Sequence, residues 1–478
     1  MTAKIITIFY LISLLASLWM VSRYQIRLDN EQRLKKMLVV LFSGYLLAVT
    51  FIYVDTLRWE GPILFLSMVS FCPFVWLLIG ILRRYGYKGD LGILILTVTL
   101  NSLGLVVLYR LDISSGWFLT RAVGYQGIIP MALKQLLYSM IALLGVVIGI
   151  SRGYFKAVIE KIAERKDILI WGFIAFALLV LPKLFGFSAW LTQDKSLQPS
   201  EFAFKIIFLV FVSKYYESRS SEILLKHYPI KEVIKLVLFV FSGIVIFFFL
   251  PLVILQKELG TGLLIGLSFI ILTAYVTNRF SFFMVGLVLI ALAIYVGTQL
   301  SGHVEKRVIA AWLDWREYAF KPFREGEKLY PGYQIFTALA AIRMSPWGVG
   351  IGNGILKHTT MDKTIVPKAV HDFIAIPIAA EIGIMAIIII GTGYFILLDK
   401  AMQKNRSLTF KNILAAGIAT AFMTQGLYNL SSVIALLPAT GIPLPWISYG
   451  GSAVFANYIL IGLLSAILDD RENSRREE

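Results

Sequence analysis

The sequence is poor in charged residues and has almost no cysteine. Asp, Glu, Lys and Arg make up 15% of its 478 residues, whereas an ordinary soluble domain has about 25%. Cys72 is the only cysteine, which excludes an internal disulfide and a metal cluster held by thiolates. The 4 histidines include no pair at metal-ligand spacing. The sequence therefore predicts no metal site built from its own side chains.

Long apolar runs take the place of the missing charge. Hydrophobic residues make up 58% of the chain, and its mean hydropathy is +0.77. A helix needs about 20 mainly apolar residues to cross the hydrocarbon core, and it pairs all its own backbone groups, as lipid requires. We therefore predict an all-α polytopic integral membrane protein with about thirteen transmembrane helices. The predicted spans are 5–22, 37–54, 62–82, 92–109, 133–150, 168–185, 201–218, 234–255, 260–277, 281–300, 371–397, 409–435 and 450–468.

Basic residues gather in every second loop between these spans. They follow the first, third, fifth, seventh and eleventh spans, and loops rich in Lys and Arg remain in the cytoplasm. This pattern predicts that the N-terminus lies outside and that the C-terminus is cytoplasmic. It also accounts for the net charge of +16 through contact with anionic lipid. A nucleic-acid partner, which a basic soluble protein would suggest, is not expected.

The opposite side of the membrane receives the longest loop, 301–370. Loops of that length without a role are uncommon. Its aromatic residues and mixed charge suit a segment that lies half-embedded at the interface; the aromatic residues are Trp312, Trp315, Tyr318, Tyr330 and Tyr333. The segments 186–200 and 436–452 are predicted on the same side.

Ionisable side chains inside the apolar runs are informative, because a charge at the bilayer centre costs about 2.5–3.5 kcal/mol on insertion scales. Asp372 opens the predicted span 371–397, and Glu381 lies deeper in that span. An Asp in a first turn often only complements the helix dipole, and Arg343 could be its counter-ion. The residues alone leave a structural and a functional role open for Asp372.

Two pairs of polar residues have the four-residue spacing that places both members on one helix face. Glu201 and Lys205 form the first pair; Ser200 could cap their helix, and Glu201 favours its positive end. Gln425 and Asn429 form the second pair, and they could simply bond to neighbouring helices. Structural capping explains much of the first pair, so its function is left open.

Lys257 and Glu258 lie between two predicted spans on the same outer side, where a short interfacial turn would account for them. Taken with Asp372, these residues predict an outer polar cavity that contains carboxylates and basic groups. No Walker loop is present, and the glycine-rich run 348–354 lacks the strand and helix of a nucleotide fold. ATP hydrolysis is therefore not expected.

Several of these residues lie in runs that resemble motifs of the SEDS family (shape, elongation, division and sporulation; RodA, FtsW and SpoVE). The run 437–452, which reads LPATGIPLPWISYGGS, resembles the C-terminal signature of that family almost residue for residue. The other similar runs are Gln198–Glu201, Glu258–Thr261, Gly332–Gln334, Gly348–Gly352 and Asp372–Ile374. The sequence departs from the family pattern just before Asp372, where Lys368 replaces an acid, Val370 a His and His371 a Thr.

The resemblance implies how the chain is divided. It covers about residues 92–470, which are expected to form a SEDS-like polymerase core of ten helices. Residues 1–91 are then an N-terminal extension of about three transmembrane helices, and 471–478 are a cytoplasmic tail.

The same resemblance implies a function. Family members are peptidoglycan glycosyltransferases that polymerise lipid II, a disaccharide-pentapeptide on undecaprenyl pyrophosphate, for cell growth, division or sporulation. The implied location is the bacterial plasma membrane, and the implied partners are membrane lipid and a class B penicillin-binding protein. A lipid II flippase and a non-catalytic scaffold of the elongation or division complex remain alternatives.

The resemblance also implies roles for single residues. Asp372 corresponds to the family's catalytic residue and would be the base. Lys205, Arg343 and Lys368 would stabilise the departing diphosphate, and a divalent cation (Mg²⁺ or Mn²⁺) could share that role. The expected substrate-binding residues are Trp190, Glu201, Lys205, Glu258, Gln334, Arg343, Lys368 and Ser448.

Overall fold

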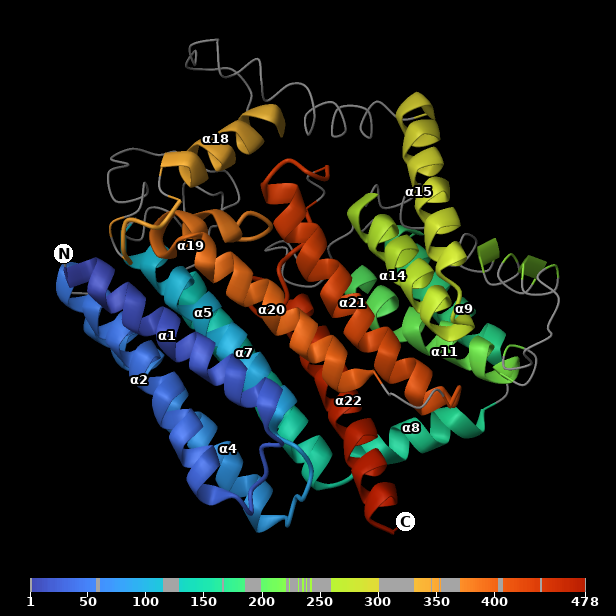
Figure 1. Ribbon diagram of the computed structural model, residues 1–478, viewed down its shortest axis with the longest axis horizontal. Helices are drawn as coiled ribbons and strands as arrows, with labels where there is room; N and C mark the ends of the chain where they lie inside the picture. The colour runs from blue at the N-terminus through green and yellow to red at the C-terminus, as the bar shows by residue number, and fades with distance from the viewer. Residues whose placement is uncertain are drawn as a thin grey trace.

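The computed structural model describes most of the chain. The described ranges are 2–56, 61–114, 129–165, 167–184, 199–220, 259–300, 331–344, 346–351, 370–402, 407–438 and 441–477, with a few single residues between them. Within these ranges every regular element is a helix (Figure 1), which confirms the predicted all-α fold. Nine helices in the described part are long and apolar enough to cross a membrane.

The first half of the chain forms α1 (Thr2–Arg23), α2 (Glu31–Thr56), α3 (Gly61–Val69), α4 (Phe71–Arg84), α5 (Gly92–Ser114), α7 (Met131–Ser151), α8 (Tyr154–Glu164), α9 (Ile168–Leu184), α10 (Pro199–Phe202), the π-helix η1 (Ala203–Phe208) and α11 (Leu209–Ser218). The second half forms α14 (Leu259–Thr277), α15 (Phe280–Leu300), α18 (Pro331–Met344), α19 (Ala375–Ile382), α20 (Ile384–Ala401), α21 (Phe410–Val433) and α22 (Gly451–Glu477).

Two predicted spans are interrupted helices. The span 62–82 is divided between α3 and α4, because Pro73 has no N–H with which to continue the helix. The span 371–397 was expected to be one helix but is divided at Gly383, where φ is +99°; glycine adopts this left-handed region without steric cost. The predicted span 234–255 lies almost entirely outside the described residues.

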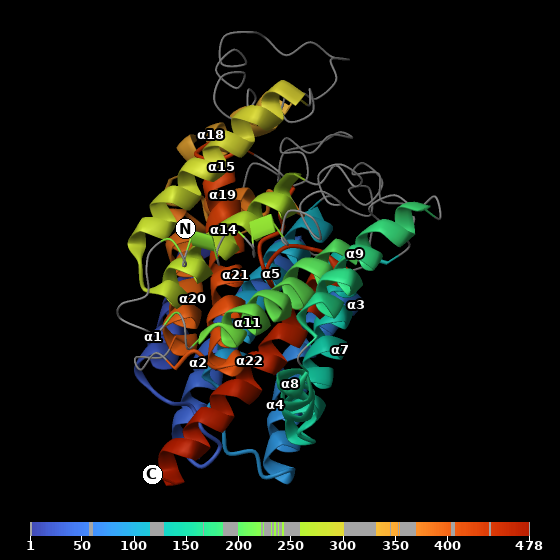
Figure 2. The ribbon, with the colours of Figure 1, turned by 90° about the vertical axis from the view of Figure 1, so that its right-hand side faces the viewer.

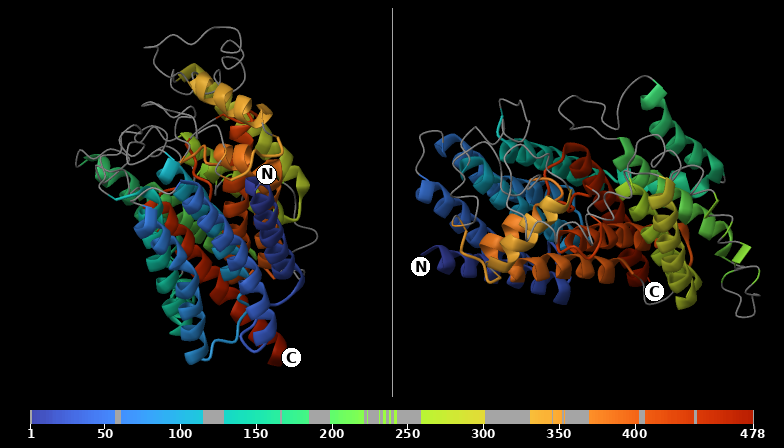
Figure 3. Two further views of the ribbon diagram at one scale, coloured as in Figure 1. Left: turned by 90° about the vertical axis from the view of Figure 1, so that its left-hand side faces the viewer. Right: turned by 90° about the horizontal axis from the view of Figure 1, so that it is seen from above.

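Two helices form the centre of the bundle. The apolar stretch of α5 is completely buried and contacts α1, α2, α7 and α20, as expected for a helix that is apolar on all sides. Helix α21 is mostly buried between α11, α14 and α20. Figure 3 shows the blue helices α1–α4 on one flank and the yellow α15 on the opposite flank.

The two ends of the bundle differ. One, called here the upper end, bears α18, α19 and the N-terminus of α1 (Figures 1 and 2). The lower end bears α8 and the C-terminus. At the lower end Asp90 Oδ1 accepts hydrogen bonds from Ile26 N (2.8 Å) and Gly92 N (2.8 Å), and its Oδ2 pairs with Lys400 Nζ (2.8 Å). Three loops that are predicted to be cytoplasmic thus meet on one side.

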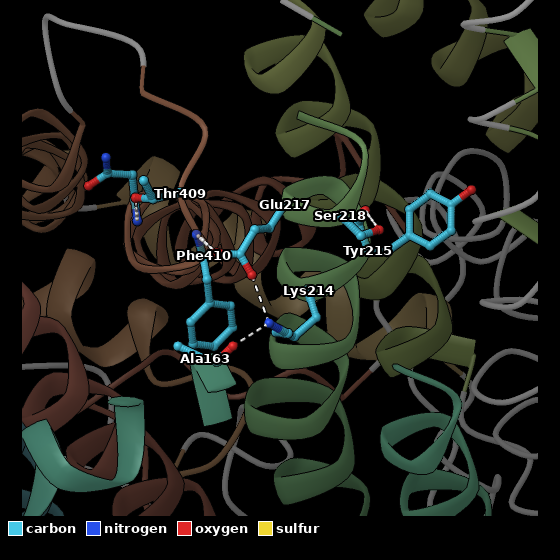
Figure 4. Close-up of polar contacts among 8 residues, drawn as sticks. Ala163, Lys214, Tyr215, Glu217, Ser218, Thr409 and Phe410 are labelled. Atoms are coloured by element: carbon cyan, nitrogen blue, oxygen red, sulfur yellow. Dashed lines mark hydrogen bonds and ion pairs between the residues drawn. The ribbon is translucent and has the colours of Figure 1, made fainter. Parts of the chain in front are cut away.

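A second, partly buried contact joins three more lower-end segments, as Figure 4 shows. Lys214 Nζ donates to Ala163 O (2.8 Å) and pairs with Glu217 Oε2 (2.7 Å), while Glu217 Oε1 accepts from Phe410 N (2.9 Å). The end of α8, the end of α11 and the start of α21 are therefore held together. This cluster lies at the end of the bundle opposite to α18 and α19, so we assign to it a structural role in holding the helices together.

The Asp90 contact gives a test of how the extension is attached. Asp90→Asn keeps an acceptor for the backbone but loses the ion pair with Lys400, both side chains being largely buried. We expect the free energy of unfolding to fall by about 1–3 kcal/mol, measured by thermal unfolding in detergent. In the double variant Asp90→Asn, Lys400→Met the free energy of unfolding should fall by less than the sum of the losses in the two single variants, because the two side chains interact.

The matched control is Glu31→Gln, since Glu31 forms exposed ion pairs with Lys35 and Arg83. Exposed pairs contribute little, and no measurable change is expected. Equal losses for the Asp90 and Glu31 variants would contradict the assigned role of Asp90.

Candidate functional site

Asp372 lies in a turn that leads into α19 at the upper end of the bundle. The turn spans Val370–Ile374, and Asp372 is buried, with 6% of its surface exposed. Its Oδ2 is 3.8 Å from where a Cβ on Gly441 would lie. The carboxylate of Asp372 is therefore adjacent to the backbone of the segment 441–450, which belongs to the glycine- and proline-rich motif and is called here the motif loop.

Hydrogen bonds from α21 hold the turn and the motif loop together. The side-chain amide of Asn429 donates to Asp372 O (2.7 Å) and to Ile442 O (2.7 Å). One turn earlier on the same helix, Gln425 donates to Pro443 O (2.7 Å). The two residues that could have bonded to neighbouring helices instead bind the backbone of two loops, and they fix the position of Asp372.

The motif loop also binds the turn directly. Tyr449 N donates to Val370 O (2.9 Å), and the Ser448 hydroxyl donates to His371 O. The same hydroxyl accepts from Leu444 N (2.8 Å). Ser448 is 4% exposed, so the structure places this predicted substrate-binding residue in the loop's internal framework rather than on an open surface.

Residues that the sequence reasoning missed fix the other side of the motif loop. Gln135 of α7 donates to Ser448 O (3.1 Å) and accepts from Gly450 N (3.2 Å). Gly104 of α5 packs so tightly on the loop that a Cβ there would lie 2.7 Å from Ile447 Cα. The sequence indicates these two roles only weakly, because a Gln or a Gly inside an apolar helix can have many other roles.

Trp446 anchors the middle of the motif loop. It has a positive φ of +62°, which is uncommon for a bulky residue, and it is 1% exposed. Its ring packs on Phe422 and Tyr394, with centroids 4.4 and 6.1 Å apart. Tyr394 OH also donates to Pro445 O (3.0 Å). Aromatic packing and hydrogen bonds together hold the loop in a strained conformation.

The predicted pair Glu201 and Lys205 forms a buried ion pair, as its spacing suggested. Lys205 is 1% exposed, and its Nζ also donates to Asn457 Oδ1 (2.7 Å) on α22. Lys205 lies in the π-helix η1, an irregularity that is frequent at functional sites. Asn457 is six residues after the start of α22, or about 9 Å along the helix, and the motif loop leads into that start.

A second buried ion pair joins α5 to α19. Arg110 Nε of α5 is 3.4 Å from Glu381 Oε1 of α19, and both side chains are less than a tenth exposed. Nearby, Asp112 Oδ2 accepts from Ala132 N (2.6 Å) and caps the start of α7. Arg110 and Asp112 could have been found from the sequence, because each is a charge at the end of an apolar run.

The remaining predicted residues have mixed placements. Arg343 is exposed near the end of α18, and no ion pair joins it to Asp372 within the part of the chain that the structure describes. Gln334 lies in the first turns of α18, and its side chain is not among those described. Trp190, Glu258 and Lys368 lie outside the described residues. Over the described ranges no three His, Cys, Asp or Glu side chains converge as a metal site.

Comparison with known proteins gives matches over most of the chain. The family model of the FtsW/RodA/SpoVE cell cycle proteins matches residues 91–473. The peptidoglycan glycosyltransferase RodA of Mycobacterium tuberculosis H37Rv is 28% identical over 412 residues, which cover 81% of this chain and 79% of that protein. The probable peptidoglycan glycosyltransferase FtsW of Trichlorobacter lovleyi is 25% identical, over 78% of this chain and 92% of that protein. A crystal structure of the Thermus thermophilus rod shape determining protein RodA aligns with 81% of this chain and 98% of that chain, with 18% identity and a TM-score of 0.48.

The amide of Asn429 can be tested by substitution. Asn429→Leu has a similar size but leaves Asp372 O and Ile442 O without their donor, and each unpaired buried group costs about 1–3 kcal/mol. We expect a lower midpoint of thermal unfolding and faster hydrogen exchange of the amides in 370–374.

Thr420→Val on the same helix is the control, because the buried Thr420 hydroxyl has no hydrogen-bond partner within the described residues. That variant should be as stable as the parent or more so. If the two variants lost stability equally, Asn429 would be an ordinary packing residue.

Proposed function

Because this chain belongs to the FtsW/RodA/SpoVE cell cycle protein family, we propose that it is a peptidoglycan glycosyltransferase that polymerises lipid II. The observation that carries the proposal is the buried carboxylate of Asp372 at the upper end of a membrane bundle, on a turn whose backbone is held by the motif loop and by Asn429. Lipid II would reach this end from the outer leaflet. The enzyme would therefore polymerise glycan strands on the outer side of the membrane, for cell wall synthesis in growth, division or sporulation.

The reaction requires one proton transfer and one leaving group. The 4-hydroxyl oxygen of one sugar forms a bond to the anomeric carbon of another, the bond from that carbon to the diphosphate oxygen breaks, and undecaprenyl diphosphate leaves with the electron pair. Asp372 would take the hydroxyl proton, and general bases of this kind contribute about 10²–10⁴ in rate. Its buried position would limit competition from water.

Cationic groups would stabilise the departing diphosphate. Arg343 is exposed at the upper end and is available to an anionic ligand, and Lys368 remains a candidate. Lys205 is engaged by Glu201 and Asn457, so we assign to it the positioning of α10 against α22. A Mg²⁺ or Mn²⁺ ion bound to the substrate diphosphate could share the charge.

The proposal includes the environment of the enzyme. The chain would be a multi-pass protein of the bacterial plasma membrane that acts with membrane lipid and a class B penicillin-binding protein. Residues 92–470 would be the polymerase core, which the family match to 91–473 supports, and 1–91 would be an extension. The basic loops that meet at the lower end support a cytoplasmic lower end.

The decisive substitution is Asp372→Asn, which keeps the size of the side chain but removes the base. With purified protein and lipid II, we expect glycan polymerisation to fall about 100-fold or more, whereas folding is retained. Asp399→Asn, at an exposed lower-end position, is the matched control and should polymerise at the parent rate.

Other outcomes would point to other functions. An Asp372→Asn variant that polymerises lipid II at near the parent rate would rule out the catalytic assignment. A parent protein that moves lipid II across liposomes without polymerising it would be a flippase, and a parent that only binds its partner would be a scaffold.

The proposed orientation has its own test. Reporter fusions at residue 30, in the basic loop after α1, and at the C-terminus should both be cytoplasmic, because positive loops remain inside. An external signal from residue 30 would show that the predicted orientation of the extension is wrong.

A further inference from the structure

The break between α19 and α20 is covered by the segment Pro346–Ile351. Gly383 ends one helix and begins the next, so the backbone groups around it lack part of the helical hydrogen-bonding pattern. The segment supplies partners through three hydrogen bonds: Val349 N to Ala380 O (3.1 Å), Gly350 N to Glu381 O (2.9 Å) and Ile384 N to Pro346 O (3.0 Å). The end of α19 is therefore fixed by chain that lies before Asp372 in the sequence.

Close backbone contact makes this arrangement specific. Gly348 has a φ of +77°, and a Cβ there would lie 2.6 Å from Glu381 O. Gly383 has a φ of +99°, and a Cβ there would lie 2.8 Å from Trp347 O. Side chains at either position would separate the segment from the break.

Helix α1 holds the same segment from its other side. Thr7 Oγ1 accepts a hydrogen bond from Ile351 N (2.9 Å) and donates one to Ala3 O (2.7 Å). Thr7 and Ile351 are 5% and 1% exposed, so water cannot reach Ile351 N to take the place of the Thr7 hydroxyl as its hydrogen-bond partner. A Cβ on Gly350 would lie 2.9 Å from Ala3 Cβ, which places the backbones of α1 and the segment in contact.

We infer that Thr7 is a positioning residue that holds Pro346–Ile351 against the α19–α20 break and so helps to set the position of Asp372, an inference that rests on the proposed polymerase function. Helix α19 is only 8 residues long, about 12 Å, and Asp372 lies just before it. A shift of its far end would move the turn that carries the carboxylate. Thr7 precedes residue 91, where the family match begins, so the extension contributes to a site in the matched region.

A passive role for α1 is the alternative reading. One face of α1 bears large apolar side chains that are exposed and suit lipid: Ile5, Ile8, Phe9, Ile12 and Leu15. A helix that only filled space beside α5 would need no hydroxyl at position 7. The two readings therefore differ in what the loss of that single hydroxyl does to catalysis.

The test compares Thr7→Val, which keeps the branched shape, with Thr7→Ser, which keeps the hydroxyl. Ser17→Ala is the matched control, because Ser17 is a fully buried residue of α1 whose hydroxyl donates within its own helix, to Ser13 O (2.8 Å). For Thr7→Val we expect kcat per folded molecule to fall about 3- to 10-fold, as for one lost hydrogen bond. KM for lipid II should be little changed, and Thr7→Ser should restore kcat.

Hydrogen exchange supplies a readout that needs no activity. In Thr7→Val the amides of 347–351 and 380–384 should lose protection together, whereas Ser17→Ala should leave them protected. Parent kcat in Thr7→Val with unchanged exchange would overturn the inference. If the parent chain does not polymerise lipid II, the proposed function fails, and the exchange result alone then decides whether α1 holds the segment.

Discussion

The structure depends on the two hydrogen bonds that the buried amide of Asn429 donates to Asp372 O and Ile442 O. Both acceptors belong to irregular backbone inside a helical bundle, where no lipid can pair them and an unpaired group would be costly. One side chain satisfies both carbonyls and thereby joins the turn before α19 to the motif loop. The other contacts of the site add to this junction: Ser448 and Tyr449 from the loop itself, and Gln135 from α7.

This junction is needed because the span 371–397 is divided into the short helix α19 and the longer helix α20. A continuous helix would be positioned along its whole length by packing, but a helix of 8 residues needs support at each end. Its start is held by Asn429 and the motif loop, and its end by the segment 346–351 and the Arg110–Glu381 pair. Asp372 is thus presented by a short element whose position is set by α5, α7, α21 and, through Thr7, by α1.

Much of the fold could be predicted from the sequence, because length and apolar composition determine which segments can be membrane helices. The four-residue spacing of Glu201 and Lys205 correctly indicated a shared face. The break at Gly383 could not be predicted, since it depends on a distant segment that pairs with the exposed backbone. The roles of Asn429 and Gln425 could not be predicted either, because spacing shows which residues share a helix face but not which carbonyl groups accept their hydrogen bonds. The count of thirteen helices remains a prediction.

The central claim is that the motif loop acts on catalysis through the position of Asp372. The most direct measurement is a double-mutant cycle in kcat, with purified protein and lipid II, between Ser448→Ala and Asp372→Glu. Asp372→Glu keeps a carboxylate but displaces it, so the benefit of exact positioning is already lost. The account predicts that Ser448→Ala lowers kcat in the parent and has little further effect in Asp372→Glu, because the two residues act as a unit. Independent, multiplicative effects of the two substitutions would contradict it.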